Sequence, residues 1–412
     1  MKKVGLRFLD YVQMDTRSNM PKPGEESPKP SSKGQLELAE KLHQELRELG
    51  VEDHQFSDFS DGSFIVHFPA TEGFKKSPHV VFAAHMDTYY GFNGKANPII
   101  HDYLSGDIRL PNNDVVIPEA DLSGLGGKKI ITSDGTSLLG ADDKAGVAAL
   151  VTTIEWVIFS NYNHGDLTFW FCVDEEIGAL DIKVIPEEMV KSWDILWTVD
   201  GERLGPIDIG CLVCRMVPVT FKGVDAHPGV QGDKLKPAHY AAAALVFNMA
   251  SLPTPMNTSG MESFYYAANI EGTPSKATVL CAPRSFDREE SEKMLAHLKD
   301  MAEVCANKYG CTYELEDRLV CINTRDAIEK HSGLLEPGKI AHESTGYKPV
   351  LENVRGGTDG AMVNMAYPDL PAPNMGTGAK NLHGPQEFLV VEELEECVQA
   401  MMMMVDLYVK MD

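Results

Sequence analysis

The chain has little positive charge and no long apolar segment. Lys and Arg number 37 against 61 Asp and Glu, and the formal net charge at pH 7 is -24. This excess of negative charge disfavours binding to nucleic acids and to anionic membrane surfaces. No apolar run approaches the roughly 18 residues that a membrane-spanning helix needs. We therefore expect neither a nucleic acid nor a membrane among the partners of this protein.

Cysteine is also scarce. Eight cysteines are scattered over 412 residues, far below the density of a disulfide scaffold. The first ten residues contain three basic side chains but lack the apolar core of a secretory signal. We therefore expect reduced thiols and a cytoplasmic location. Cys211 and Cys214 have the C-x-x-C spacing, but no second pair exists and the pair begins a predicted strand, which favours a structural role.

At 412 residues the chain exceeds the length at which a single hydrophobic core usually divides, so the sequence predicts two domains. Helical patterns occur at 35–49 and 144–159, and a proline-rich stretch at 14–33 is expected to be a loop. Strands buried on both faces of a sheet are predicted by three apolar runs, at 79–84, 167–173 and 195–199. This alternation is typical of a helix-covered α/β sheet.

The middle of the chain has a different order of elements. In chain order the predicted elements are a strand at 213–222, a helix at 237–252, strands at 264–270 and 277–286, a helix at 289–308 and a strand at 312–321. This β-α-β-β-α-β order is that of a ferredoxin-like unit. We therefore expect an inserted ferredoxin-like α+β domain at residues 211–322 and a discontinuous larger domain at residues 1–210 and 323–412.

Each of the three apolar runs is followed directly by side chains that bind metals. His85 and Asp87 follow the first run, Glu175 and Glu176 follow the second, and Asp200 follows the third. The carboxyl ends of parallel strands meet at one edge of an α/β sheet, and ligands gather outside that edge. The sequence therefore predicts that a histidine and several carboxylates lie close together there.

Asp142, in the glycine-flanked turn that leads into the helix at 144–159, adds a fourth contribution. Carboxylates crowded in this way repel one another unless a cation neutralises them. Histidine with carboxylates, and without cysteine, suits a catalytic zinc ion, or cobalt or manganese. Asp87 lies two residues after His85 on an extended segment, so it can accept the second ring N–H and support catalysis by orienting that histidine. Each motif alone is common at solvated strand ends, and their conjunction predicts the metal site.

Seven motifs run through the chain in this order: HMDT, GADDKAG, DEEIG, VDG, AHPG, RGGTDG and HGPQEF. With these motifs the chain resembles the M20 metallopeptidases over essentially its whole length, and the resemblance points to their tripeptide aminopeptidase branch. It implies a zinc-dependent aminopeptidase with two Zn²⁺ per chain, for which Co²⁺ or Mn²⁺ can substitute. It also implies that the inserted domain serves as a lid and joins two copies into a homodimer.

Carried over position by position, the resemblance implies five metal ligands. Asp142 would bridge both ions. His85 and Asp200 would complete the ligands of one ion, and Glu176 and His383 those of the other. The choice of His383 rests on the resemblance in HGPQEF alone, because spacing does not distinguish it among 13 histidines.

The resemblance also assigns residues to catalysis and to substrate binding. Glu175 matches the general base, which takes a proton from the attacking water and gives it to the leaving amine. His227 matches a histidine that reaches into the site of a partner subunit, although without the resemblance it would be interpreted as a turn histidine before a proline. Arg284 matches an arginine that clamps the C-terminal carboxylate of the substrate, and Arg355 is expected to line the pocket.

Three functions remain open from the sequence. The leading hypothesis is an aminopeptidase that acts on short peptides with a free N-terminus, such as tripeptides. The second is an M20-type amidohydrolase or dipeptidase that uses the same ligands on N-acyl amino acids or dipeptides. The third is a metal-free binding protein on the same fold, disfavoured because every ligand position and Glu175 are filled. Pro237 stands where relatives usually have an asparagine near the substrate, which leaves the substrate range open.

Overall fold

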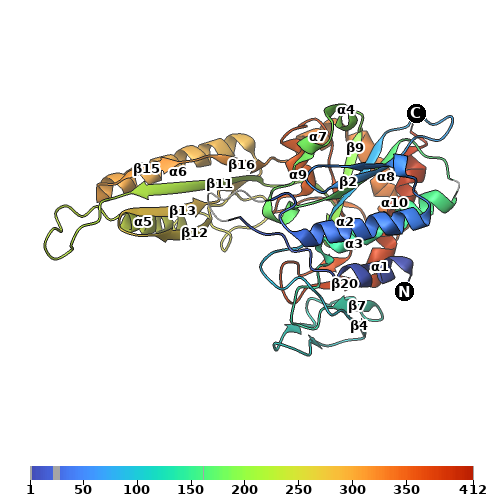
Figure 1. Ribbon diagram of the computed structural model, residues 1–412, viewed down its shortest axis with the longest axis horizontal. Helices are drawn as coiled ribbons and strands as arrows, with labels where there is room; N and C mark the ends of the chain where they lie inside the picture. Colours follow the sequence, from blue (N-terminus) through green and yellow to red (C-terminus); the bar gives the residue numbers. More distant parts are fainter. Residues whose placement is uncertain (1, 22–27, 161, 412) are drawn as a thin grey trace. The chain divides into compact units, whose positions relative to one another are not determined.

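The computed structural model describes residues 2–21, 28–160 and 162–411 (Figure 1). Residues 22–27, within the predicted proline-rich loop, lie outside this range. The described residues form two compact units: the larger one takes in those of Met1–Ile209, Asp326–Glu352 and Thr358–Asp412, and the inserted one Gly210–Arg325 and Asn353–Gly357. The segment 353–357, which the sequence assigns to the larger domain, thus belongs to the inserted unit. Among the described residues, no helix is both long and apolar enough to cross a membrane.

An eight-stranded mixed sheet forms the centre of the larger unit (Figure 1). In order across the sheet its strands are β1 Phe56–Asp58, β2 Phe64–Phe68, β8 Leu167–Cys172, β3 Val80–His85, β9 Ile195–Gly201, β18 Asn374–Gly376, β10 Pro206–Gly210 and β17 Val350–Asn353. β3 runs parallel to both β8 and β9, so the carboxyl ends of all three meet at one edge. These are the three strands predicted from the apolar runs.

Both faces of this sheet are covered, which confirms the predicted helix-covered α/β architecture. Along β3, Val80, Phe82 and Ala84 enter one core, and Val81 and Ala83 enter the other. All residues of β3 and β8 are buried, which explains their continuous apolar sequence. The first core is completed by helices α1 Lys3–Tyr11, α2 Lys33–Leu49, α3 Ala141–Ser160, α7 Arg325–Lys330, α8 Glu336–Ser344 and α10 Val391–Tyr408. The second core includes side chains of α4 Glu187–Val190 and α9 Asp359–Asn364.

The larger unit also contains a second sheet, which the sequence analysis does not predict. Its strands, in order, are β19 Ala379–Lys380, β20 Phe388–Val390, β7 Lys129–Thr132 and β4 Ile99–Asp102, and a separate hairpin joins β5 Ile108–Arg109 to β6 Val116–Ile117. Strands of two to four residues are too short for an alternating pattern to be recognised. The loop between β19 and β20 carries His383.

The inserted unit is an antiparallel sheet with two helices packed in its core. Its elements, in chain order, are β11 Val213–Lys222, α5 Ala238–Ala250, β12 Ala267–Gly272, β13 Lys276–Cys281, β14 Arg284–Ser285, α6 Arg288–Tyr309, β15 Thr312–Leu315 and β16 Arg318–Cys321. β11 pairs with β14 and β16 over its first half and with β13 and β15 over its second half. This order, β-α-β-β-β-α-β-β, is the predicted one except that two of the predicted strands are each divided in two. Pro237 is the residue before the first turn of α5.

A proline in β11 divides the strand predicted at 312–321. Pro218 has no N–H to donate to a neighbouring strand. Its carbonyl accepts the N–H of Glu316 at 3.2 Å, so the edge of Pro218 that lacks the donor faces this partner. Pairing is therefore interrupted between β15 and β16.

Two other predicted strands also differ from the structure. The strand predicted at 277–286 is divided at Pro283 into β13 and β14. The strand predicted at 264–270 begins later, as β12, because Phe264 forms only an isolated bridge with Arg284. Both differences lie where a proline or a change of pairing partner interrupts the hydrogen bonds between strands. The apolar character of a segment does not reveal such an interruption.

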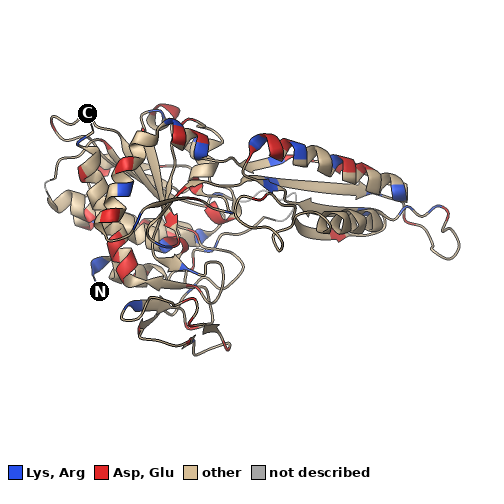
Figure 2. Cartoon of the chain, turned by 180° about the vertical axis from the view of Figure 1, so that it is seen from behind, with Lys and Arg blue, Asp and Glu red and all other residues tan. Residues whose placement is uncertain are grey.

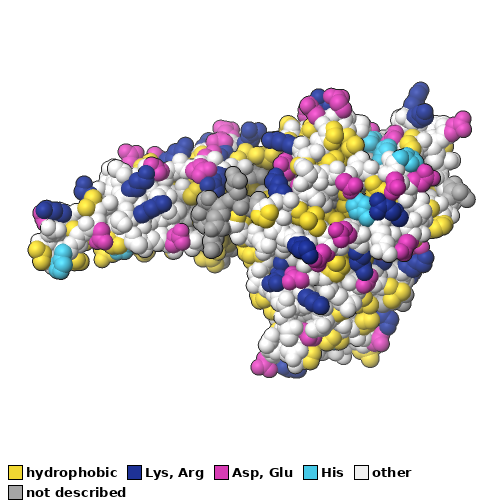
Figure 3. Space-filling model, viewed as in Figure 1, with side chains coloured by type: hydrophobic (Ala, Val, Ile, Leu, Met, Phe, Trp, Pro, Cys, Tyr) yellow, Lys and Arg dark blue, Asp and Glu magenta, His cyan; other side chains and the backbone are white. Residues whose placement is uncertain are grey.

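The two helices of the inserted unit differ in charge. Lys, Arg, Asp and Glu residues occur along α6, whereas the sequence of α5 contains none (Figure 2). Despite its apolar sequence, α5 leaves Tyr240 54% and Phe247 73% exposed. On the face of the molecule seen in Figure 3, acidic and basic side chains are interspersed over the surface.

Gly146 marks a close approach of α3 to β9. A methyl group on Gly146 would lie 2.1 Å from the carbonyl oxygen of Val199 and 2.4 Å from the carboxylate of Asp143. We expect Gly146→Ala to lower the free energy of unfolding by about 1–3 kcal/mol, because the start of α3 must shift. Urea unfolding followed by circular dichroism measures the change. Gly333→Ala, at a position with open space around it, is the control, and equal stability of the two variants would contradict the close packing.

Candidate metal centre

His85, Asp142 and Asp200 form the first group of candidate ligands. His85 ends β3, and Asp200 lies in the neighbouring strand β9. Asp142 comes from the turn at the start of α3. Nε2 of His85 lies 3.0 Å from Oδ1 of Asp142 and 3.5 Å from Oδ1 of Asp200. The parallel pairing of β3 with β9 therefore brings the two strand-end side chains to the same place.

Asp142, Glu176 and His383 form the second group. Nε2 of His383 lies 3.1 Å from Oδ2 of Asp142 and 3.1 Å from Oε2 of Glu176. Asp142 thus presents one carboxylate oxygen to each group. The five side chains singled out as ligands in the sequence lie together, in two groups that share one residue.

The two groups hold more negative charge than their histidines offset. Burial, and then the charge of Asp142, raises the pKa of Asp200 well above its usual range and the pKa of Glu176 to about 7. Burial opposes ionisation of Asp142, but hydrogen bonds from His383 and His85 bring its pKa below the usual range. Burial likewise opposes the charge of His383, but its hydrogen bonds to Asp142 and Glu176 raise its pKa to about 11. The protein alone must therefore retain protons here.

A divalent cation fits these donors. In each group the three ligand atoms lie within 4.8 Å of one another. Imidazole nitrogens and carboxylate oxygens are the donors that zinc uses in catalytic sites. Oε1 of Glu176 is buried and accepts no hydrogen bond from the described residues, whereas buried polar atoms normally have a partner. A cation would satisfy this oxygen and offset the repulsion between the carboxylates.

Asp87 connects His85 to the turn that carries the two glutamates. Nδ1 of His85 lies 3.1 Å from the backbone oxygen of Asp87 and 3.3 Å from its Oδ1. The carboxylate of Asp87 also accepts the backbone N–H groups of Glu175 and Glu176, each at 3.1 Å, and the hydroxyl of Ser18. The side chain expected to orient His85 thus also fixes the turn after β8.

Glu175 begins that turn, a single 3₁₀ turn over Glu175–Ile177. The residue before it, Asp174, has a φ of 58° and accepts the N–H of Ser31 at 2.8 Å. Burial, followed by the charge of Asp359, raises the pKa of the Glu175 carboxyl group well above its usual range. A carboxyl group tuned in this direction is suited to proton transfer near neutral pH.

Glu387 is a residue of this region that the sequence analysis does not single out. Its buried carboxylate accepts the N–H groups of Gly140 at 2.8 Å, Ala141 at 2.8 Å and Asp142 at 3.1 Å. Glu387 lies four residues after His383, so it ties the His383 loop to the turn that carries Asp142. The only signal for it in the sequence is its place in the HGPQEF motif.

Asp359, the first residue of α9, is a second acid that the sequence analysis does not single out. It is fully buried, and neither of its carboxylate oxygens accepts a hydrogen bond from the described residues. Burial raises its pKa to about 7. Its charge in turn raises the pKa of Glu175 and of Asp200. Asp359 lies in the RGGTDG motif, from which the sequence analysis assigns a role to Arg355 alone.

His227 and Arg284 lie in the inserted unit. His227 is exposed in the loop after β11, and its imidazole makes no hydrogen bond with the described residues. Nη1 of Arg284 donates to the backbone oxygen of Arg215 at 2.6 Å and to that of Pro283 at 3.2 Å. Part of the Arg284 guanidinium is therefore already engaged in holding the first half of β11.

Arg355 belongs to the inserted unit rather than to the larger one. Its Nη1 donates to the backbone oxygens of Gly260 at 2.7 Å and Glu262 at 3.0 Å, and its Nη2 donates to Oγ1 of Thr258 at 2.7 Å. The guanidinium also lies 4.9 Å from the ring centroid of Phe264. These contacts attach residues 353–357 to the 258–264 segment, a long-range pairing that the order of motifs does not reveal.

The C-x-x-C pair is part of the packed interior of the inserted unit. All eight cysteines are free and buried. The thiol of Cys211 donates to the backbone oxygen of Ile322 and that of Cys214 to Leu212, each at 3.4 Å. Among the described residues, neither metal group contains cysteine.

Comparison with known proteins places this geometry in context. A family model described as peptidase family M20/M25/M40 matches residues 140–406. That span contains four of the five candidate ligands. A protein called peptidase T from Caldanaerobacter subterraneus subsp. tengcongensis is 34% identical over 420 residues, which cover 100% of this chain and 100% of the relative.

Two solved structures have the same architecture. A tripeptidase from Staphylococcus aureus has a TM-score of 0.76 at 18% identity and covers 99% of this chain and 98% of its own. A dinuclear metal-binding peptidase of the M20 family from Bacillus subtilis has a TM-score of 0.66 at 16% identity, with 100% of this chain and 98% of that chain covered. At these identities the likeness shows a shared fold.

The raised pKa values predict that the metal-free protein is less stable at pH 7 than at pH 5. Burial raises the pKa of Glu176, Asp359 and Glu387 to about 7 each, whereas such groups titrate near pH 4 when unfolded. Between these values the folded chain binds more protons than the unfolded chain, so the free energy of unfolding falls as the pH rises. We expect the thermal midpoint of chelator-treated protein to fall from pH 5 to pH 7.

Added Zn²⁺ should raise this midpoint more at pH 7 than at pH 5, because metal binding replaces the retained protons. Glu387→Gln removes one of the titrating groups and should make the pH dependence of the chelated protein shallower. A midpoint that stays constant or rises over this range would contradict the raised pKa values.

Proposed function

The chain belongs to peptidase family M20/M25/M40, and we propose that it is a two-zinc aminopeptidase that removes the N-terminal residue from short peptides, tripeptides in particular. The observation that carries the proposal is the position of Asp142, which presents one oxygen to the histidine of each candidate ligand group. A carboxylate shared in this way suits two metal ions that act on one scissile bond. The names of the relatives, peptidase T and tripeptidase, support the substrate class.

Each group would hold one ion. His85, Asp142 and Asp200 would bind the first, and Asp142, Glu176 and His383 the second. Zn²⁺ suits these donors, and Co²⁺ or Mn²⁺ can replace it. When bound, the ions would polarise the carbonyl of the scissile bond and lower the pKa of the attacking water.

Glu175 would carry the proton. Its backbone N–H is held by Asp87, and its neighbour Glu176 would bind the second ion, which supports a position for the Glu175 carboxylate beside the reacting atoms. Nearby cations favour the ionised form of Glu175. Its carboxylate then accepts a proton from the water that attacks the carbonyl carbon, and it gives that proton to the nitrogen of the leaving amine as the C–N bond breaks.

Residues of the inserted unit would bind the peptide. Arg284 clamps the C-terminal carboxylate, for which a planar guanidinium provides parallel donors. Arg355 is hydrogen-bonded to the 258–264 segment, and from there it would line the pocket. Pro237, just before α5, has no polar side chain, so residue 237 gives the peptide no side-chain hydrogen bond.

Two copies would pair through the inserted unit. Within the described residues β12 pairs with β13 alone, and five of its six residues are exposed. Beside it, the uncharged helix α5 exposes Tyr240 and Phe247, and Ile270 of β12 is 47% exposed. An exposed edge strand with apolar neighbours is a template for pairing with a second copy. The free imidazole of His227 would then serve the site of the partner subunit.

The cytoplasm is the proposed location. Buried thiols without disulfide partners are compatible with a reducing compartment.

A peptide panel tests the proposed reaction. We expect zinc-loaded enzyme to release the N-terminal residue from tripeptides, and to leave tripeptides with an acetylated N-terminus and N-acyl amino acids uncut. Glu175→Gln should retain close to two Zn²⁺ per chain by elemental analysis and lose about 10²–10⁴-fold in kcat, the range of a general base. Glu188→Gln, at a side chain of α4 that is 92% exposed, is the matched control and should retain full activity.

Turnover of N-acyl amino acids with inert free tripeptides would favour the amidohydrolase instead. A wild-type chain that binds no metal would favour the binding protein. Full activity of metal-loaded Glu175→Gln would overturn the role of Glu175.

A charge on α5 tests the homodimer. Phe247→Glu places a carboxylate on the exposed apolar face, and we expect a monomer by light scattering coupled to gel filtration, with reduced kcat because His227 of the partner is lost. Val304→Glu is the control, since Val304 is 63% exposed on the charged helix α6, and it should remain dimeric. A wild-type monomer with full activity would contradict the pairing.

A further inference from the structure

The two candidate histidine ligands are oriented by different means. The His85 side chain is 1% exposed, and its Nδ1 faces both the backbone oxygen and the carboxylate of Asp87. The His383 side chain is 47% exposed. Within the part of the chain that the structure describes, Nδ1 of His383 makes no hydrogen bond. Metal-bound histidines usually rely on such an outer hydrogen bond to fix the ring, so His383 needs another constraint.

Tyr89 supplies a contact that can act as this constraint. The rings of Tyr89 and His383 are 4.4 Å apart between centroids and only 4° from parallel. A stacked ring restricts rotation of the imidazole out of its plane, while Nε2 stays free to face Asp142 and Glu176. His383 has a φ of 61° in the β19–β20 loop, so its backbone lies in the sparsely populated left-handed region and is not part of a regular element.

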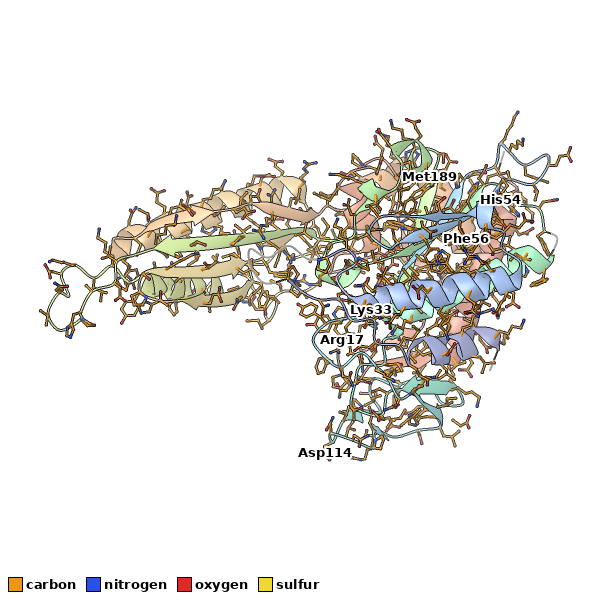
Figure 4. The ribbon with its side chains drawn as sticks, in the orientation of Figure 1. Arg17, Lys33, His54, Phe56, Asp114 and Met189 are labelled. Atoms are coloured by element: carbon orange, nitrogen blue, oxygen red, sulfur yellow. The ribbon has the colours of Figure 1, made fainter. Side chains whose placement is uncertain are left out.

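The segment that carries Tyr89 is itself anchored. Tyr89 follows Asp87 by two residues on the chain leaving β3, and Thr88 donates to the backbone oxygen of Thr16 at 3.3 Å. Arg17, labelled in Figure 4, donates to the backbone oxygen of Phe92 at 3.1 Å. The ring centroids of Tyr89 and Tyr90 lie 4.7 Å apart, with the two rings tilted by 43°. Tyr89 therefore lies on an anchored segment that also carries Asp87, the residue that contacts Nδ1 of His85.

We propose that Tyr89 is the positioning residue of His383, and that it controls the affinity of the ion held by Glu176 and His383. This inference rests on the two-ion site of the proposed function. The stacked tyrosine ring takes the place of an outer hydrogen bond. Its loss frees the exposed imidazole to rotate, so it weakens the second ion and leaves the ion at His85 and Asp200 unchanged. The phenol hydroxyl is not required, since the constraint is the flat ring.

The test measures Zn²⁺ binding to chelator-treated full-length protein by competition with a chromophoric chelator, and it records the visible spectrum of the Co²⁺-loaded protein. We expect Tyr89→Ala to bind one ion with wild-type affinity and the other roughly 10-fold or more weakly, the range for loss of an outer contact. Tyr89→Phe should restore both affinities and the two-ion Co²⁺ spectrum. Tyr162→Ala removes an exposed tyrosine that contacts Trp156, and both its affinities should be those of the wild type.

Tyr89→Leu retains more apolar side chain than Tyr89→Ala and has no flat ring, so it covers the case in which Tyr89→Ala fails to fold. The same selective loss in Tyr89→Leu supports the role of the ring. Two wild-type affinities in either folded variant would overturn it, as would equal weakening of both ions. Wild-type protein that binds fewer than two ions would overturn the two-ion site itself, which separates failure of the proposed function from failure of this inference.

Discussion

Asp142 presents one carboxylate oxygen to each of two histidines, 3.0 Å from Nε2 of His85 and 3.1 Å from Nε2 of His383. This double contact sets the positions of both histidines relative to each other. It also places the charge of Asp142 beside Asp200 and Glu176, whose pKa values it raises. The site is therefore built around a concentration of negative charge that protons or cations must offset. The hydrogen bonds around the site hold these negatively charged side chains in place.

That support comes from two sheets of the larger unit. The large sheet places candidate ligands at the ends of parallel strands, and Asp87 joins two of these ends by accepting backbone N–H groups from the turn after β8. The small sheet delivers His383 from a hairpin loop. Glu387, in the same loop, accepts the N–H groups of Gly140, Ala141 and Asp142. It therefore fixes the His383 loop against the turn that carries Asp142. Rigid placement of these charged side chains preserves both contacts of Asp142, since a small displacement would separate it from one of the two histidines.

In the inserted unit the sequence predicts the elements but not all of their pairing. Its order of strands and helices is evident from local patterns, and its longest strand, β11, coincides with the predicted 213–222. The interruption opposite Pro218 was not predicted, because it depends on which edge of the proline faces the neighbouring strand. Arg355 was assigned to the larger domain for a similar reason. Its contacts to the 258–264 segment join residues about 95 positions apart, and linear order carries no trace of them.

The sequence by itself determined the buried strands and the candidate ligands that directly follow them. His85, Glu176 and Asp200 are adjacent to apolar runs, and burial on both faces of a sheet is a local property that the residues of each run display. Only the tertiary structure decided how His383 reaches Asp142, 241 residues away, and that a tyrosine ring and the carboxylate of Glu387 support the two. These contacts depend on how a second sheet of very short strands folds beside the first. Such strands have no recognisable period, so their packing is settled by long-range contacts alone.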